Sequence, residues 1–280
     1  MDWIVFLAVL AGAAMHAGWN ALVKTGLDRT SSIFLLAFIQ GIISLLLLPF
    51  FAFPSALSWP FIAVSAVLHS GYKIFLIRAY EHGDLSQVYP LARGTAPLIV
   101  AIVGIFLLSE SLTATKFAAV CAIGLGVMLM STMRGSGGAP MSAKTLFFAL
   151  GTALFTASYT LVDGVGAQLS GTASGFTLWM FVGDGILMTL YALLLRGRGL
   201  FAAARGNVAS GTAAGVLSLG SYWIAIWAFT LAPIALVAAL RETSVLFAML
   251  IAVFLLGEKA SPRRWLAAGL ILAGIVLMRL

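Results

Sequence analysis

Two stretches of the chain decide its fold: YPLARGTAPLIVAIVGIFLLSE at residues 89–110 and VAALRETSVLFAMLIAVFLLGE at residues 237–258. A shift of 148 residues superposes charged residues and glycines: Arg93 on Arg241, Glu110 on Glu258, and Gly126 on Gly274. Apolar sequences match by chance at leucine and alanine, whereas charged and glycine matches at one fixed offset are not expected. The chain therefore contains two related halves.

The composition around these stretches is that of a protein dissolved in lipid. Of 280 residues, 62% are hydrophobic and only 9% are charged, whereas a soluble domain has about 25% charged residues. Apolar runs of about 20 residues recur, which is long enough to span a bilayer. We predict helices at 3–23, 32–52, 59–79, 85–108, 114–132, 143–165, 173–195, 208–230, 233–256 and 262–279.

The positions of these helices define the domain organisation. Five lie in a first repeat at 1–132 and five in a second repeat at 143–280, separated by a glycine-rich linker at 133–142. Because five is odd, the second repeat must enter the membrane from the opposite side. We therefore predict an all-α integral membrane protein with ten transmembrane helices in two inverted five-helix repeats.

The distribution of charge predicts the orientation. The net charge is +7, and most lysines and arginines fall in the loops on one side of the predicted membrane, which identifies that side as cytoplasmic. Both termini are then periplasmic, in a bacterial inner membrane. The cations are scattered singly between apolar runs, which does not fit a nucleic-acid-binding face.

The residue types exclude several chemistries. With Cys121 as its one cysteine, the chain cannot form an intrachain disulfide or a cysteine metal cluster. Its sequence contains no phosphate-binding loop, zinc-binding His-Glu-x-x-His or nucleophile elbow. We therefore expect no catalytic residues, no metal and no cofactor.

The repeated motifs resemble a known family. Residues 89–97 followed by 108–110 resemble the first EamA repeat of the drug/metabolite transporter superfamily, and residues 239–245 followed by 256–259 resemble the second. Residues 16–24, HAGWNALVK, resemble its first helix. The resemblance implies ten helices in two inverted repeats and the export or exchange of small metabolites by alternating access. Members include amino-acid exporters of the YddG type, sugar-phosphate carriers and flippases, and the motifs also resemble a branch associated with phosphonate utilisation.

Arg93 and Arg241 are the sharpest candidates for a binding site. Each lies about eight residues into its predicted helix, or roughly 12 Å at the rise of an α-helix, close to the middle of a core about 30 Å thick. A charge there costs about 2.5 kcal/mol or more unless it faces a wet or polar interior. Binding of an anionic group is one interpretation. Bonding to carbonyls near Pro90, or pairing with Glu242, is the other.

Further residues surround this predicted site. We expect the substrate also to contact Tyr89, Trp19, Asn20, Tyr72, Trp223, Ser244 and Glu242. Packing between helices is the alternative for the aromatic residues. Glu242 has Gly94 as its counterpart. A functional asymmetry between the halves is one interpretation, and neutralisation by a cation of the first half, such as Lys73 or Arg93, is the other.

Other ionisable residues are candidates for coupling transport to protons. Asp184, His16, His69 and Lys73 lie inside predicted helices, where such groups typically carry protons or ions. Asp163 lies near the predicted end of its helix and is expected to be solvated. Glu110 ends its helix, and we expect Lys116 or another loop cation to compensate it.

The sequence thus predicts a secondary transporter that exports or exchanges a small organic metabolite, amino-acid-like, across the inner membrane by alternating access. Its partners would be the metabolite, the lipid bilayer, and protons or a counter-substrate. The oligomeric state is left open. A flippase or a sugar-phosphate or phosphonate carrier is the alternative within the superfamily. A membrane enzyme and a non-catalytic membrane assembly subunit are alternatives of other classes.

Overall fold

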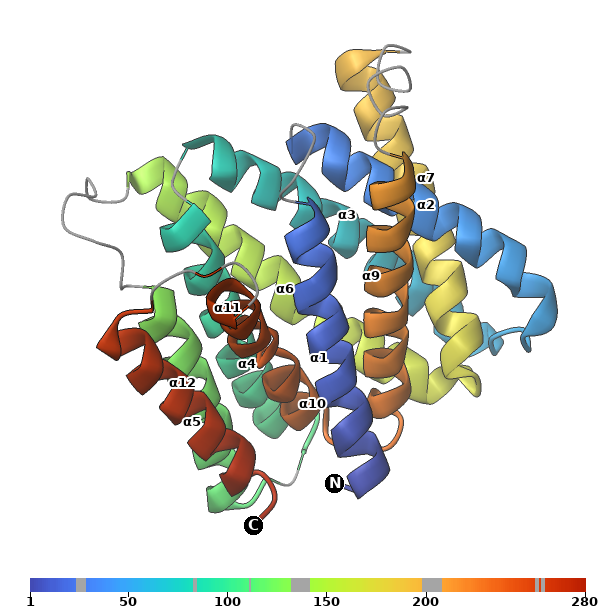
Figure 1. Cartoon of the computed structure of the whole chain (residues 1–280). Coiled ribbons are helices and arrows are strands. Elements are labelled where there is room, and N and C mark those ends of the chain that lie inside the picture. Colours follow the sequence, from blue (N-terminus) through green and yellow to red (C-terminus); the bar gives the residue numbers. More distant parts are fainter. Residues whose placement is uncertain are drawn as a thin grey trace.

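The structure is a computed structural model that describes residues 1–23, 29–82, 85–110, 112–131, 142–197, 208–254, 257 and 260–280. Within these ranges every regular element is helical (Figure 1). The elements are α1 (Trp3–Val23), α2 (Arg29–Leu47), η1 (Leu48–Phe50), η2 (Ala56–Ser58), α3 (Trp59–His82), α4 (Leu85–Leu107), α5 (Ala114–Ser131), α6 (Ala143–Ser170), α7 (Ala173–Arg196), α9 (Val208–Phe229), α10 (Ile234–Arg241), α11 (Ser244–Phe254) and α12 (Pro262–Leu277).

Most helices are long and apolar enough to cross a bilayer. Seven stretches of the described chain meet that requirement: Trp3–Asn20, Ser31–Phe50, Ala56–Ala79, Ala143–Ser170, Ala173–Arg196, Val208–Phe229 and Ile234–Phe254. Arg93–Leu107 and Ala114–Met130 are shorter apolar helices. Each range in which the sequence predicts a helix contains one. Two ends differ by about five residues: α2 gives way to a 3-10 turn at Pro49, and α6 continues to Ser170.

The helix predicted at 233–256 is broken at its centre, and the prediction of one continuous helix there was wrong. Glu242–Thr243 separates α10 from α11. The amides of these two residues donate to carbonyls three residues back, at 3.0 and 3.2 Å, where an α-helix would use the fourth. The counterpart α4 continues through Gly94 without a break. The two halves therefore differ in backbone at the position where Glu242 replaces glycine.

Local sequence signals fix where several helices begin. Ser142, Thr172 and Ser261 each accept a hydrogen bond from the amide three residues on, at 3.1, 3.1 and 3.4 Å. These caps satisfy amide donors that the first turn of a helix leaves free. Gly171, with φ of 70°, ends α6 in the left-handed conformation that favours glycine, so α7 can start two residues later.

Contacts between helices recur in equivalent copies. Gly126 on α5 faces Ile271 on α12, and Gly274 on α12 faces Ile123 on α5. A methyl group built on either glycine would lie 2.6 Å from the Cγ1 atom of that isoleucine. The shift of 148 residues converts one contact into the other. The α5–α12 seam is therefore self-complementary, as expected across a two-fold axis.

The other seams follow the same pattern. Gly41 of α2 and Gly185 of α7 approach each other directly, and a methyl group on Gly185 would lie 3.0 Å from the Cα atom of Gly41. α3 packs on α6, and α9 packs on α1 (Figure 1). In these seams Gly71 of α3 meets Phe155, and Gly220 of α9 meets Met15. The α3–α6 seam thus has the α9–α1 seam as its counterpart, with the halves exchanged.

The outer surface and the ends of the bundle suit a bilayer. Large apolar side chains lie more than two-thirds exposed on several helices: Ile4, Phe50, Phe53, Leu57, Phe106, Leu107, Leu194 and Phe254. The two termini lie at the same end of the bundle (Figure 1). There the Arg279 guanidinium stacks on the Trp3 ring at 3.7 Å and donates to the Met1 carbonyl at 2.8 Å.

Candidate functional site

Arg93 on α4 and Glu242 between α10 and α11 join the two halves in the interior. The Arg93 Nε atom lies 3.0 Å from the Glu242 Oε2 atom, an ion-pair distance without hydrogen-bond geometry. The two residues are 2% and 4% exposed. Of the two cations expected to neutralise Glu242, the structure selects Arg93. The counterpart Gly94 has no room for a side chain, because a methyl group there would collide with Met128.

Arg241 ends α10 and packs against an aromatic ring. Its guanidinium carbon lies 4.6 Å from the centre of the Tyr222 ring, and the residue is 8% exposed. Its place at the C-terminal end of α10 is one that a helix dipole favours for a cation. No carboxylate of the described residues lies within ion-pair distance of it. Arg241 is therefore a buried cation that the described residues leave without a direct counter-ion.

His16 on α1 brings a third element to these arginines. The Arg93 Nη2 atom lies 2.8 Å from His16 Nε2, and Trp19 Nε1 lies 3.2 Å from His16 Nδ1. Both neighbours carry only N–H donors, whereas a neutral imidazole offers one acceptor nitrogen. His16 can therefore accept from one of them at a time. Arg93 Nη2 also donates to Ser244 Oγ at 3.3 Å.

Asp163 on α6 is the carboxylate that sequence reasoning placed wrongly. It is fully buried, because α6 continues beyond the predicted helix end. It accepts hydrogen bonds from Ser65 and from the Tyr222 hydroxyl, and its Oδ2 atom lies 3.0 Å from His69 Nε2. The His69 ring stacks on Tyr159 at 4.0 Å. The spacing of Tyr159 and Asp163 repeats that of His16 and Asn20, which is the signal that could have identified them.

Lys73 and Asp184 form a separate buried ion pair between α3 and α7. Asp184 also accepts a hydrogen bond from Ser70 at 3.0 Å. Lys73 is 6% exposed and Asp184 is fully buried. These two predicted coupling residues are thus brought together. His69, the third, lies one turn away on α3, while His16 lies at the arginines.

A model of the EamA-like transporter family matches residues 3–132 and 143–280. The chain belongs to the EamA-like transporter family. Members are transporters, so this EamA protein is a multi-pass membrane protein.

A protein of known crystal structure has the same fold as this EamA chain. It aligns with a TM-score of 0.74 and 15% identity over 98% of this chain and 94% of its own. At that identity the likeness concerns the fold alone. No curated protein matches the sequence significantly.

The other predicted contacts of this EamA protein are only partly assembled. Tyr72 packs edge-on against Tyr159 at 5.6 Å, next to the buried cluster. Asn20 donates to the His16 carbonyl at 2.8 Å. Trp223 lies elsewhere: its Nε1 donates to Ser174 Oγ at 3.0 Å, and its ring lines an open apolar groove with Gly220, Ile224 and Trp227. Tyr89 lies outside the residues whose side chains the structure describes.

Glu110 reaches a partner that the sequence did not suggest. Its carboxylate accepts from the amides of Ile234 and Ala235, at 2.6 and 3.3 Å, and so caps α10. The expected loop cation is not its observed partner. Pro233, at the start of α10, provides no side-chain cap, and a carboxylate is favoured at a helix N-terminus. A residue of the first half therefore completes a helix of the second.

Proposed function

We propose that this EamA protein is a secondary transporter that exports or exchanges a small organic metabolite by alternating access, and that Arg241 binds the metabolite's anionic group. The buried guanidinium of Arg241, which has no carboxylate of the described residues within ion-pair distance, carries this proposal. A carboxylate on the substrate would supply that counter-ion, and arginine pairs with a carboxylate through two parallel hydrogen bonds. An amino-acid-like substrate fits this chemistry.

The reciprocal seams support an architecture of ten spanning helices in two inverted five-helix repeats. Gly126–Ile271 and Gly274–Ile123 are one contact in two copies, and the α3–α6 seam is matched by the α9–α1 seam. The termini share one end of the bundle, as an even number of crossings requires (Figure 1). With the loop cations cytoplasmic, these termini would be periplasmic in a bacterial inner membrane.

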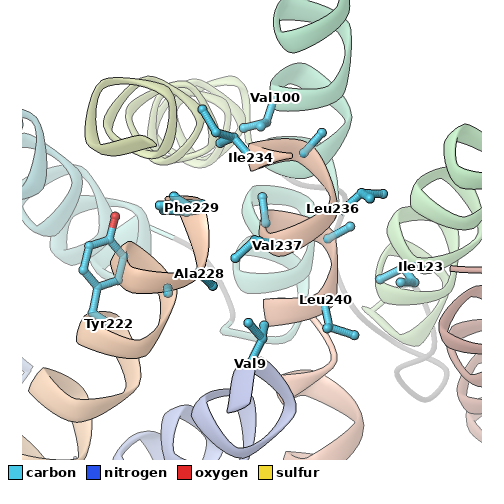
Figure 2. Packing of buried hydrophobic residues seen from close by; sticks show 14 of the residues in the cluster. Val9, Val100, Ile123, Tyr222, Ala228, Phe229, Ile234, Leu236, Val237 and Leu240 are labelled. Carbon is cyan, nitrogen blue, oxygen red and sulfur yellow. The ribbon is translucent and has the colours of Figure 1, made fainter. Parts of the chain in front are cut away.

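The packing of α10 supports a pathway closed at the end that carries the termini. Figure 2 shows its side chains, among them Ile234, Val237 and Leu240, enclosed by Val9 of α1 and Val100 of α4. Every residue of α10 is buried. The joint at Glu242–Thr243 lies at the inner end of α10. Bending there would open one side of the site. Discontinuous helices line the substrate sites of many transporters.

The proposed pose places the anionic group on Arg241 and the substrate body against Tyr222. Arg93 and Ser244 would add hydrogen bonds once the anion competes with Glu242. Trp19, Asn20, Tyr72 and Tyr89 remain proposed contacts at the edge of this pocket. Protons or a counter-substrate would drive the cycle.

The test is a thermal-shift screen of the purified full chain against amino acids, organic phosphates and phosphonates. A ligand that binds only the folded state raises the unfolding temperature. We expect a carboxylate-bearing metabolite to stabilise the wild type, and Arg241→Ala to lose this stabilisation and its transport in proteoliposomes. The exposed Arg263 provides the matched control Arg263→Ala, which should retain both. Retention of both by Arg241→Ala would reject the proposed role of Arg241.

A further inference from the structure

The ionisable side chains buried in the described interior balance in charge. Three cations and three carboxylates are less than one-tenth exposed: Lys73, Arg93 and Arg241, and Asp163, Asp184 and Glu242. A net charge removed from water is strongly unfavourable. With a neutral imidazole at His69, these six charges therefore sum to zero. An anionic ligand would disturb this balance by one unit.

Two of the three cation–carboxylate pairs are in direct contact, and the third is separated by an aromatic ring. Lys73 and Asp184 pair directly, and so do Arg93 and Glu242. Tyr222 lies between the remaining cation and carboxylate: its ring face lies on Arg241 and its hydroxyl donates to Asp163. Asp163 thus compensates Arg241 from the far side of a tyrosine. An anion bound directly to Arg241 would take over that compensation and leave Asp163 with an unbalanced negative charge.

His69 is the group positioned to restore the balance. Its Nε2 atom lies 3.0 Å from the Asp163 carboxylate. Imidazole is in general the side-chain group that can gain or lose a proton in the physiological range. The groups around it come from α6, α7 and α9: Tyr159 and Tyr222 stay neutral near pH 7, and Phe181 is apolar. On α3 itself, Lys73 is held by Asp184 and Ser65 is neutral.

We infer that His69 and Asp163 form a proton-binding site, and that this site takes up one proton when an organic anion binds Arg241. The inference rests on the proposed function. The proton comes from solvent hydronium: one O–H bond breaks, one N–H bond forms on the imidazole, and a water molecule is left. The loaded interior then contains four neutral pairs: anion with Arg241, His69 with Asp163, Arg93 with Glu242, and Lys73 with Asp184. Anion and proton would therefore move together in the same direction, which fits the exchange mode of the proposed function, because export with a proton would run against an inward proton gradient.

The first experiment needs no ligand. The sequence has three histidines, so a sample labelled with ¹⁵N-histidine gives three pairs of imidazole nitrogen signals, which His16→Gln and His82→Gln assign. Arg241→Gln removes the charge that Asp163 compensates, as a bound anion would. We expect the protonated fraction of His69 at pH 7 to rise severalfold in Arg241→Gln and to stay unchanged in the control Arg263→Gln. An unchanged His69 signal in Arg241→Gln would overturn the inference.

The second experiment measures protons directly in the wild-type protein. Propionate and benzoate are the probes, because their own carboxyl groups stay ionised at pH 7. In weakly buffered detergent with a pH indicator, we expect uptake of about one proton per bound anion, as charge linkage requires. His69→Gln should bind the anion without this uptake. Thermal stabilisation by a probe without proton uptake would reject the proton site and leave the proposed function standing. Absence of stabilisation by either probe, at saturating concentrations, would reject an anion site at Arg241.

Discussion

The Lys73–Asp184 pair allows a quantitative test of whether a buried ion pair in this protein serves stability or transport. Asp184→Leu would leave the Lys73 ammonium buried with no counter-ion, and Lys73→Met would leave the carboxylate with Ser70 alone. Breaking one partner of a buried pair costs about 3–5 kcal/mol. For a chain of this order of size, each kcal/mol of lost unfolding free energy lowers the unfolding temperature by about 2–4 °C. The unfolding temperature of each single variant should therefore be about 6–20 °C below that of the wild type.

The double variant Lys73→Met/Asp184→Leu removes both charges and fills a similar volume. Such replacements are often neutral or stabilising, so its unfolding temperature should return close to that of the wild type. The seven tryptophans report unfolding in detergent through their fluorescence. Losses that simply add in the double variant would refute the reasoning. Transport by the double variant decides the second question: retained transport makes the pair structural, and a folded but inactive protein assigns it to coupling.

Three further predictions concern the seams between the halves. Glu110→Ala removes the charged acceptor of two amides of α10 and should cost about 2–4 kcal/mol, seen as a lower unfolding temperature, with Glu110→Gln intermediate. Gly274→Ala should lose about 1–3 kcal/mol by overpacking, whereas Gly269→Ala, whose methyl group meets nothing within 4 Å, should not. Arg279→Gln should lose about 0.5–2 kcal/mol of unfolding free energy, because it removes the stacking on Trp3. The unfolding temperature should then fall slightly, and the tryptophan emission should change. Equal stability of the two glycine variants would contradict close packing at the α5–α12 seam.

Hydropathy located the helices but could not reveal the joint in the second half. A count of apolar residues measures whether a segment can span, and residues 234–254 do so. Hydropathy does not tell whether a backbone amide donates to the carbonyl four residues earlier, as in an α-helix, or to the carbonyl three residues earlier, as at the joint. The joint lies where Arg241 packs on Tyr222 and Glu242 pairs with Arg93. Those partners come from other helices, so the break depends on tertiary contacts that local sequence does not specify.

The candidate site was also predicted only in part from the sequence. The repeat and the helix positions placed Arg93 and Arg241 in the interior, where the structure has them. Asp163 was misjudged because a helix end predicted five residues too early turned a buried position into a solvated one. Trp223 lies away from the arginines for a different reason. Hydropathy gives the depth of a residue in a spanning helix but not the direction in which it faces, and α9 turns Trp223 towards Ser174.

The joint between α10 and α11 has a kinetic consequence under the proposed mechanism. In an inverted repeat, the two access states interchange when each half adopts the conformation of the other. Here one half is jointed at Glu242–Thr243 and the other has a continuous α4, so the interchange is inexact and the two states differ in free energy. The unloaded carrier would therefore rest mainly on one side. Half-saturation concentrations measured from the two faces would differ, although the concentration gradients alone would still decide the direction of net flow.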